Sequence, residues 1–90
     1  MRKVVVTTKH RGVFFGSLVS RDGTDVVLEN ARVCVYWSKD TKGFVGLAGT
    51  GPGDGSRISP PAPKIELVDV TAVLECSPEA ADKWEAGKWS

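Results

Sequence analysis

The first part of the chain shows apolar and polar positions that alternate as they do in β-strands. Residues 3–8 are β-branched almost throughout, a composition that favours a strand. Residues 13–20 carry apolar side chains on both faces, and Gly16 lies where such a strand bends or where another backbone comes close. The polar segment ending at Gly12 and the Asp-Gly pair before residue 24 are typical of hairpin turns. With the alternation at residues 25–37, we expect three strands in a row.

This pattern stops between residues 38 and 63, a segment that holds six of the ten glycines. A segment of that composition predicts a long loop, which in a compact domain is either functional or loosely ordered. Residues 64–75 recover the strand pattern, and Asp69 marks a kink or bulge within them.

The end of the chain carries the signals of a short helix over residues 78–86. Ser77 is a good N-cap, Pro78 suits the first helical position, and Gly87 is placed to end the helix. Trp84 lies on the apolar face of this helix, where we expect it to cap the open end of a barrel. The sequence therefore predicts one domain over residues 1–90, mainly β, with a small, strongly bent antiparallel barrel.

One stretch resembles the first motif of the Sm-like small barrels, which have an SH3-type fold. It runs from Arg11 to Gly23 and continues with Val26, Leu28 and Asn30. In that family a strand reads aromatic-x-Gly-x-Leu, and a turn containing Asp leads to a strand that ends in Asn. Residues 65–73 are similar to the closing strands of such barrels. The resemblance implies an Sm-like barrel that forms homo-oligomers, and Asn30 matches a position that contacts RNA in the family, whose second, uridine-binding motif has no match here.

The whole chain is also similar to short uncharacterised proteins of bacteriophages and prophages. The elements that carry this second resemblance are Gly12-Val13-Phe14-Phe15-Gly16, Tyr36-Trp37-Ser38, Gly46-Leu47-Ala48, Thr50-Gly51-Pro52 and the tail with Trp84 and Trp89. It implies an accessory protein that acts in the cytoplasm of a bacterial host. It implies no activity.

The net charge of the chain bears on nucleic-acid binding. Twelve basic and eleven acidic residues give a net charge of +1, which argues against a domain-wide grip on nucleic acid. The basic run of Arg2, Lys3, Lys9 and Arg11 contains no acid, and is either a solvated strand edge or a phosphate-facing patch.

The remaining composition points to a cytosolic protein without a catalytic centre. The two cysteines are too few for a disulfide framework, so we expect reduced thiols. No apolar run has the length of a signal peptide or a membrane span. The single histidine, His10, has neither the partners of a metal site nor those of a catalytic triad. We expect no metal, no cofactor and no enzymatic activity.

The candidate ligand site is the glycine-rich segment 49–57. Glycines allow backbone N–H groups to converge on an anion, hydroxyls add donors, and an arginine can contact a phosphate with two N–H groups. Just before this segment come Tyr36 and Trp37, which face opposite ways on a strand, so that one packs in the core and the other could stack on a base. The predicted ligand-binding residues are Thr50, Gly51, Gly53, Ser56, Arg57, Tyr36, Trp37 and Arg11. The alternative is that this segment is only a flexible connection.

These observations favour a non-enzymatic phage accessory protein that binds a nucleotide or another phosphate-containing ligand. A concrete form is the sequestration of a nucleotide-type host defence signal, with the ligand bound by a homo-oligomer. One alternative is a protein–protein module, an inhibitor of a host protein or a virion adaptor, whose contact surface contains Trp84 and Trp89. Another is an Sm-like barrel that binds RNA or single-stranded DNA.

Overall fold

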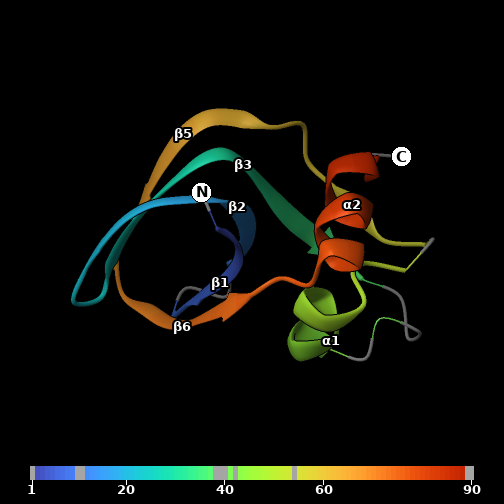
Figure 1. Cartoon of the computed structure of the whole chain (residues 1–90), viewed down its shortest axis with the longest axis horizontal. Coiled ribbons are helices and arrows are strands. Elements are labelled where there is room, and N and C mark those ends of the chain that lie inside the picture. Colours follow the sequence, from blue (N-terminus) through green and yellow to red (C-terminus); the bar gives the residue numbers. More distant parts are fainter. Residues whose placement is uncertain (1, 10–11, 38–40, 42, 54, 89–90) are drawn as a thin grey trace.

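The computed structural model describes residues 2–9, 12–37, 41, 43–53 and 55–88, which form six antiparallel strands and two short helices (Figure 1). The elements are β1 (Lys3–Thr8), β2 (Val13–Asp22), β3 (Asp25–Tyr36), α1 (Gly43–Gly49), β4 (Arg57–Ile58), β5 (Ala62–Leu67), β6 (Val70–Glu75) and α2 (Pro78–Ala86). The mainly β architecture and the C-terminal helix are confirmed. The first strand has the predicted range, and α2 has the predicted boundaries.

The strands form one curved, open sheet. Its order is β4-β3-β2-β1-β6. Both β4 and β5 pair with β3: β5 with its first half, from Val26 to Ala31, and β4 with its end, at Cys34 and Tyr36. Figure 1 shows β5 along the upper side of the view and β6 along the lower side. Among the described residues no ladder joins β5 to β6, so the closure of a barrel is not part of the observed pairing.

Two apolar clusters lie on the two faces of this sheet. The first face contributes Val4 and Val6 to a cluster with side chains from β3, β5 and β6. The second face contributes Val5 and Phe15 to a cluster that includes side chains of both helices. Because both faces of β1 are covered, its three valines are all fully buried, which explains why this strand is an unbroken β-branched run.

Gly16 confirms the predicted close approach of two backbones. A Cβ atom at this position would lie 3.0 Å from the carbonyl oxygen of Glu29 and 3.0 Å from the Cβ of Leu28. The β2–β3 register shifts at the same place, between Phe15 and Ser17. A glycine therefore allows β2 to bend against β3 where a larger residue would push the strands apart.

The helix α2 is fixed at its start and along its buried face. The Ser77 hydroxyl accepts a hydrogen bond from the Ala80 N–H at 3.0 Å, which confirms the predicted N-cap. The Trp84 ring is fully buried and stacks on Phe15 of β2 with a centroid distance of 5.2 Å. Its Nε1–H donates to the carbonyl oxygen of Leu47 in α1 at 3.0 Å. Trp84 therefore joins both helices to the second face of the sheet.

The segment 38–63 differs from the predicted loop, because it contains α1, β4 and the start of β5. Glycines at three of the seven positions of α1 give it a low intrinsic helix propensity. The helix is stabilised by packing, since Leu47 and Ala48 are buried in the second-face cluster. The predicted strand 64–75 is likewise two strands, separated at Asp69, whose φ of 55° confirms the kink.

Replacing Trp84 with Phe tests the role of this side chain. We expect Trp84→Phe to lower the free energy of unfolding by about 2–4 kcal/mol, because it leaves a cavity and removes the donor to Leu47. Trp37 is a control, since it is only half-buried, and we expect Trp37→Phe to cost less than about 1 kcal/mol. Urea unfolding followed by circular dichroism measures both, and equal losses would contradict the assignment.

Candidate functional site

Four backbone N–H groups of the glycine-rich segment 49–57 donate within the chain. Those of Thr50 and Gly51 both donate to the carbonyl oxygen of Gly46, at 2.9 and 3.0 Å. The Gly53 N–H donates to the Thr41 hydroxyl at 2.9 Å, and the Ser56 N–H to the Gly53 carbonyl at 3.0 Å. These donors hold the connection between α1 and β4 in place, so they are engaged before any ligand arrives.

The side chains of this segment are used in a similar way. The Thr50 hydroxyl donates to the Gly46 carbonyl at 3.2 Å, and the buried Ser56 hydroxyl lies 3.4 Å from that of Thr41. Gly51 is buried with a φ of 88°, and a Cβ atom there would lie 2.8 Å from the Cβ of Lys83 in α2. Sequence reasoning did not single out Thr41, a fully buried polar residue on which this connection depends.

The other predicted site residues are divided between the surface and the core. Tyr36 is 59% exposed and lies opposite Arg57 in the β3–β4 ladder, so these two predicted residues do come together. Trp37 packs against the second-face cluster, in agreement with the expectation that only one of the adjacent aromatic residues is exposed. Arg11 lies outside the described residues.

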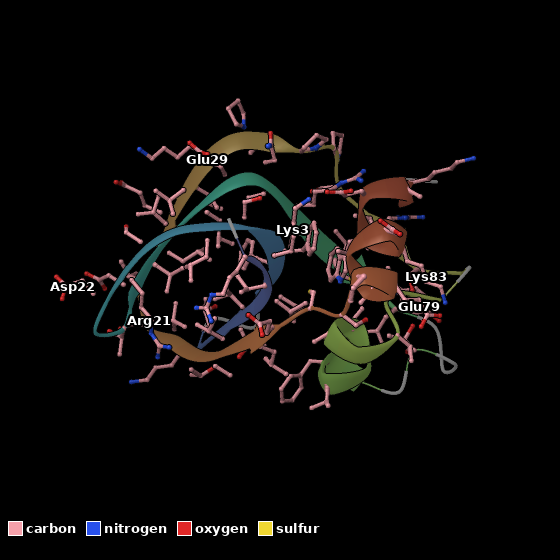
Figure 2. The ribbon with its side chains drawn as sticks, in the orientation of Figure 1. Lys3, Arg21, Asp22, Glu29, Glu79 and Lys83 are labelled. Atoms are coloured by element: carbon pink, nitrogen blue, oxygen red, sulfur yellow. The ribbon has the colours of Figure 1, made fainter. Side chains whose placement is uncertain are left out.

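A polar pocket of about 180 Å³ opens between the sheet and α2. Strands β1, β2 and β3 and the last turn of α2 form its walls, and Figure 2 shows Lys3 on the side of the sheet that faces α2. Lys3 and Ser17 are direct partners in the β1–β2 ladder, which places their side chains on one face. The lining residues are Lys3, Phe15, Ser17, Asn30, Arg32, Pro61 and Glu85, and we call this the Lys3–Asn30 pocket.

Among the residues that line the pocket, Arg32 makes the largest number of side-chain hydrogen bonds in the described structure. Its guanidinium donates to the carbonyl oxygens of Trp84 and Glu85, each at 2.7 Å, and to that of Gly87 at 2.8 Å. Its Nε–H donates to the carbonyl oxygen of Ser59 at 2.9 Å. A positive charge at the C-terminus of a helix is favourable because the helix dipole is negative there. Arg32 therefore attaches the end of α2 to β3 and keeps a full positive charge beside the pocket.

Lys3 and Glu85 supply the other two charges. The Lys3 ammonium pairs with the Glu85 carboxylate and lies 6.0 Å from the centre of the Phe15 ring. With Arg32 the pocket has two cations and one carboxylate, which gives it a formal charge of +1. The pocket therefore favours a ligand group of negative charge.

Two polar side chains at the pocket have no hydrogen bond within the described chain. They are the hydroxyl of Ser17 and the amide of Asn30. Asn30 has a φ of 51°, in the left-handed region that asparagine tolerates better than most residues. A hydroxyl and an amide together can donate to, and accept from, a bound group. They are the most available polar groups of this site.

The sequence contained only part of the signal for this pocket. Asn30 stood out through the Sm-like resemblance, and Lys3 through the basic run near the start of the chain. Glu85 lies in α2, more than fifty residues along the chain from the strand residues that line the pocket, and only the packing of α2 brings it to the sheet. No spacing in the sequence could show that contact.

Among the described residues, the thiols and the acidic side chains form neither a reactive cysteine nor a metal site. Burial raises the pKa of Cys34 to about 11, and burial also raises the pKa of Cys76 to about 11 against the opposing effect of Lys3. Both groups therefore stay protonated at neutral pH. Among the described residues, no three His, Cys, Asp or Glu side chains gather as metal ligands would. Within the same residues, neither helix has the length and apolar character needed to cross a bilayer.

The fold and the pocket define a small, mainly β protein with a polar site between its sheet and its C-terminal helix. A family model described as a domain of unknown function (DUF6948) matches residues 1–84, so the chain belongs to this family. The match extends from the start of the chain into α2 and includes Trp84. No curated protein and no solved structure matches the chain.

The glycine-rich segment provides a test of its structural role. We expect Gly51→Ala to lower the free energy of unfolding by about 1–3 kcal/mol, because the left-handed backbone and the contact with Lys83 both oppose a Cβ atom. Gly49→Ala is the matched control: a Cβ atom there meets open space, so its stability should be unchanged or higher by up to about 1 kcal/mol. Thermal unfolding measures both variants, and equal stabilities would show that Gly51 is not required for packing.

Proposed function

We propose that this protein is a non-enzymatic binding module that holds a phosphate group of a small ligand in the Lys3–Asn30 pocket. The observation that carries the proposal is the position of two polar side chains, those of Ser17 and Asn30, beside two cations and without a hydrogen-bond partner among the described residues. A phosphate accepts several hydrogen bonds at once, and bonds to a charged group are the strongest of them. The Lys3 ammonium, the Ser17 hydroxyl and the Asn30 amide are the groups that would donate.

The charges favour an anion in this pocket but allow only moderate affinity. Arg32 contributes mainly its charge, because four of its N–H···O contacts are to backbone carbonyls. The Glu85 carboxylate repels an incoming phosphate, and its pairing with Lys3 reduces this repulsion. An incoming phosphate would share the Lys3 ammonium with the carboxylate of Glu85. Weak binding that falls as the salt concentration rises is the expected behaviour.

The volume of the pocket limits what can enter it. About 180 Å³ is less than the roughly 300–1,000 Å³ of most small-molecule sites. The pocket therefore suits a head group, and the rest of the ligand would lie outside on the surface. A nucleotide bound through its phosphate is consistent with this size.

The resemblance to bacteriophage proteins makes the proposal more specific. In that form the protein acts in the cytoplasm of a bacterial host and sequesters a nucleotide-type defence signal. The site differs from the predicted glycine-rich segment, where the N–H groups of Thr50, Gly51, Gly53 and Ser56 have partners within the chain. The proposal keeps the expected class of ligand and moves its binding to the other flank of α2.

Calorimetric titration tests the proposal with inorganic phosphate, AMP, ADP-ribose and a set of cyclic di- and trinucleotides at low ionic strength. We expect at least one phosphate compound to bind, and both Asn30→Gly and Ser17→Ala to weaken it about tenfold or more. Glycine at position 30 removes the amide and still accepts the left-handed φ.

Two matched variants act as controls in this titration. Asp69→Gly changes the second non-glycine residue that has a positive φ among those described. Ser20→Ala changes a serine that lies in β2, as Ser17 does, but outside the pocket. Neither should alter the affinity. The absence of binding across the set, or equal losses in the controls, would remove this function.

A second candidate function is a protein–protein module, favoured by exposed apolar side chains on and near α1. The predicted contact surface was wrong in part, because Trp84 is fully buried, and Trp89 lies outside the described residues. Phe44 is 42% exposed and Val45 is 62% exposed, and Phe44 and Trp37 line an open groove of about 460 Å³. If this groove binds a host protein, Phe44→Ser should abolish that complex in a pull-down with the purified partner. Val19→Ser, at a similarly exposed valine of β2, should leave the complex intact.

A further inference from the structure

The open sheet ends in β4 and β5 at one edge and in β6 at the other, and β5 is protected against pairing with another strand. Pro63 lies within β5 and has no N–H to donate to a neighbouring strand. A proline is tolerated at this position because β5 is an edge strand. Lys64 and Glu66 are exposed on the same strand. Proline and charged side chains are the usual means by which a sheet edge is blocked. A neighbouring chain would find few usable hydrogen-bonding groups along β5.

The strand at the opposite edge, β6, lacks this protection. Its sequence Val-Thr-Ala-Val-Leu-Glu contains no proline and no lysine. The Cys76 N–H donates to the carbonyl oxygen of Lys3 at 2.9 Å, which fixes the alternation of hydrogen bonds between β1 and β6. Counting back along this antiparallel pair, the N–H and C=O groups of Val73 and Glu75 point away from β1. In the described part of the chain no strand pairs with that side of β6.

We propose that β6 pairs, antiparallel, with β6 of a second copy of this chain, so that two open sheets become one continuous sheet. A two-fold axis at Val73 sets this residue against Val73 of the second copy. The same register sets Thr71 against Glu75 of the second copy, on both sides of the axis. No two like charges face each other, and the outward groups of Val73 bond reciprocally, as an isologous interface requires.

Other features near this edge support a second copy as the occupant. Val68, just before β6, is 57% exposed, and α1 lies beside the end of β6 with Phe44 and Val45 on its surface (Figure 1). A two-strand ladder alone buries less area than a stable interface needs, so these apolar side chains would supply the rest. The Lys3–Asn30 pocket is lined by no residue of β6. The dimer therefore does not depend on the proposed ligand.

Charges introduced at the exposed positions 71 and 75 test the proposed register without altering the core. Thr71→Glu places a glutamate opposite Glu75 of the second copy, and we expect it to weaken dimerisation about two- to tenfold. Thr71→Lys should strengthen dimerisation by a similar factor, and adding Glu75→Lys to Thr71→Glu should restore the dimer. Lys64→Glu on the edge of β5 is the control and should have no effect. Sedimentation velocity over a range of protein concentrations gives the dissociation constants.

Amide hydrogen exchange provides a second readout that does not need a variant. The amides of Val73 and Glu75 should exchange more slowly as the protein concentration rises, while exposed amides of β5 do not change. Exchange at Val73 and Glu75 that is independent of concentration would overturn the proposal. So would a dimer that neither Thr71→Glu nor Thr71→Lys affects. Because the calorimetric test of the Lys3–Asn30 pocket uses other residues, either proposal can fail without the other.

Discussion

The burial of a single indole ring, that of Trp84, is the interaction on which the rest of the structure depends. A sheet of six short strands in a chain of ninety residues has little apolar area to bury by itself. The second face of the sheet is closed because Trp84 stacks on Phe15 and bonds to the end of α1. Without this contact α1, whose sequence is poor in helix formers, would lose its bond to α2 through the indole and part of the cluster in which Leu47 and Ala48 are buried. One side chain thus contacts the sheet and both helices at once.

The position of α2 in turn creates the candidate site. The last turn of the helix would be an exposed end with unsatisfied carbonyls if Arg32 did not bond to them. In that position the helix brings Glu85 to Lys3 and forms one wall of the pocket. Ser17 and Asn30 are then left between charged neighbours, without partners in the described chain. The chemistry of the site is therefore a consequence of how a helix end is satisfied.

The sequence predicted the parts of the fold that local patterns determine. The β-branched run of β1, the bend at Gly16, the kink at Asp69 and the N-cap at Ser77 each follow from the chemistry of one or a few residues. The helix α1 could not be predicted, because its glycines oppose it and only the contacts of Leu47 and Ala48 stabilise it. Similarly, the sequence suggested a phosphate ligand from the glycines at 49–57, where the structure shows donors already engaged. The Lys3–Asn30 pocket joins residues from both ends of the chain, and no local pattern contains that information.

The contacts of Arg32 have a consequence for how the C-terminal part of the chain can change in evolution. All four of its acceptors are backbone carbonyl oxygens, at Ser59, Trp84, Glu85 and Gly87. A backbone carbonyl is present whatever the side chain is, so substitutions at residues 59 and 85 leave this attachment intact. The side chains around the pocket can therefore diversify while the helix keeps its place, and related proteins could acquire different ligands on one unchanged frame.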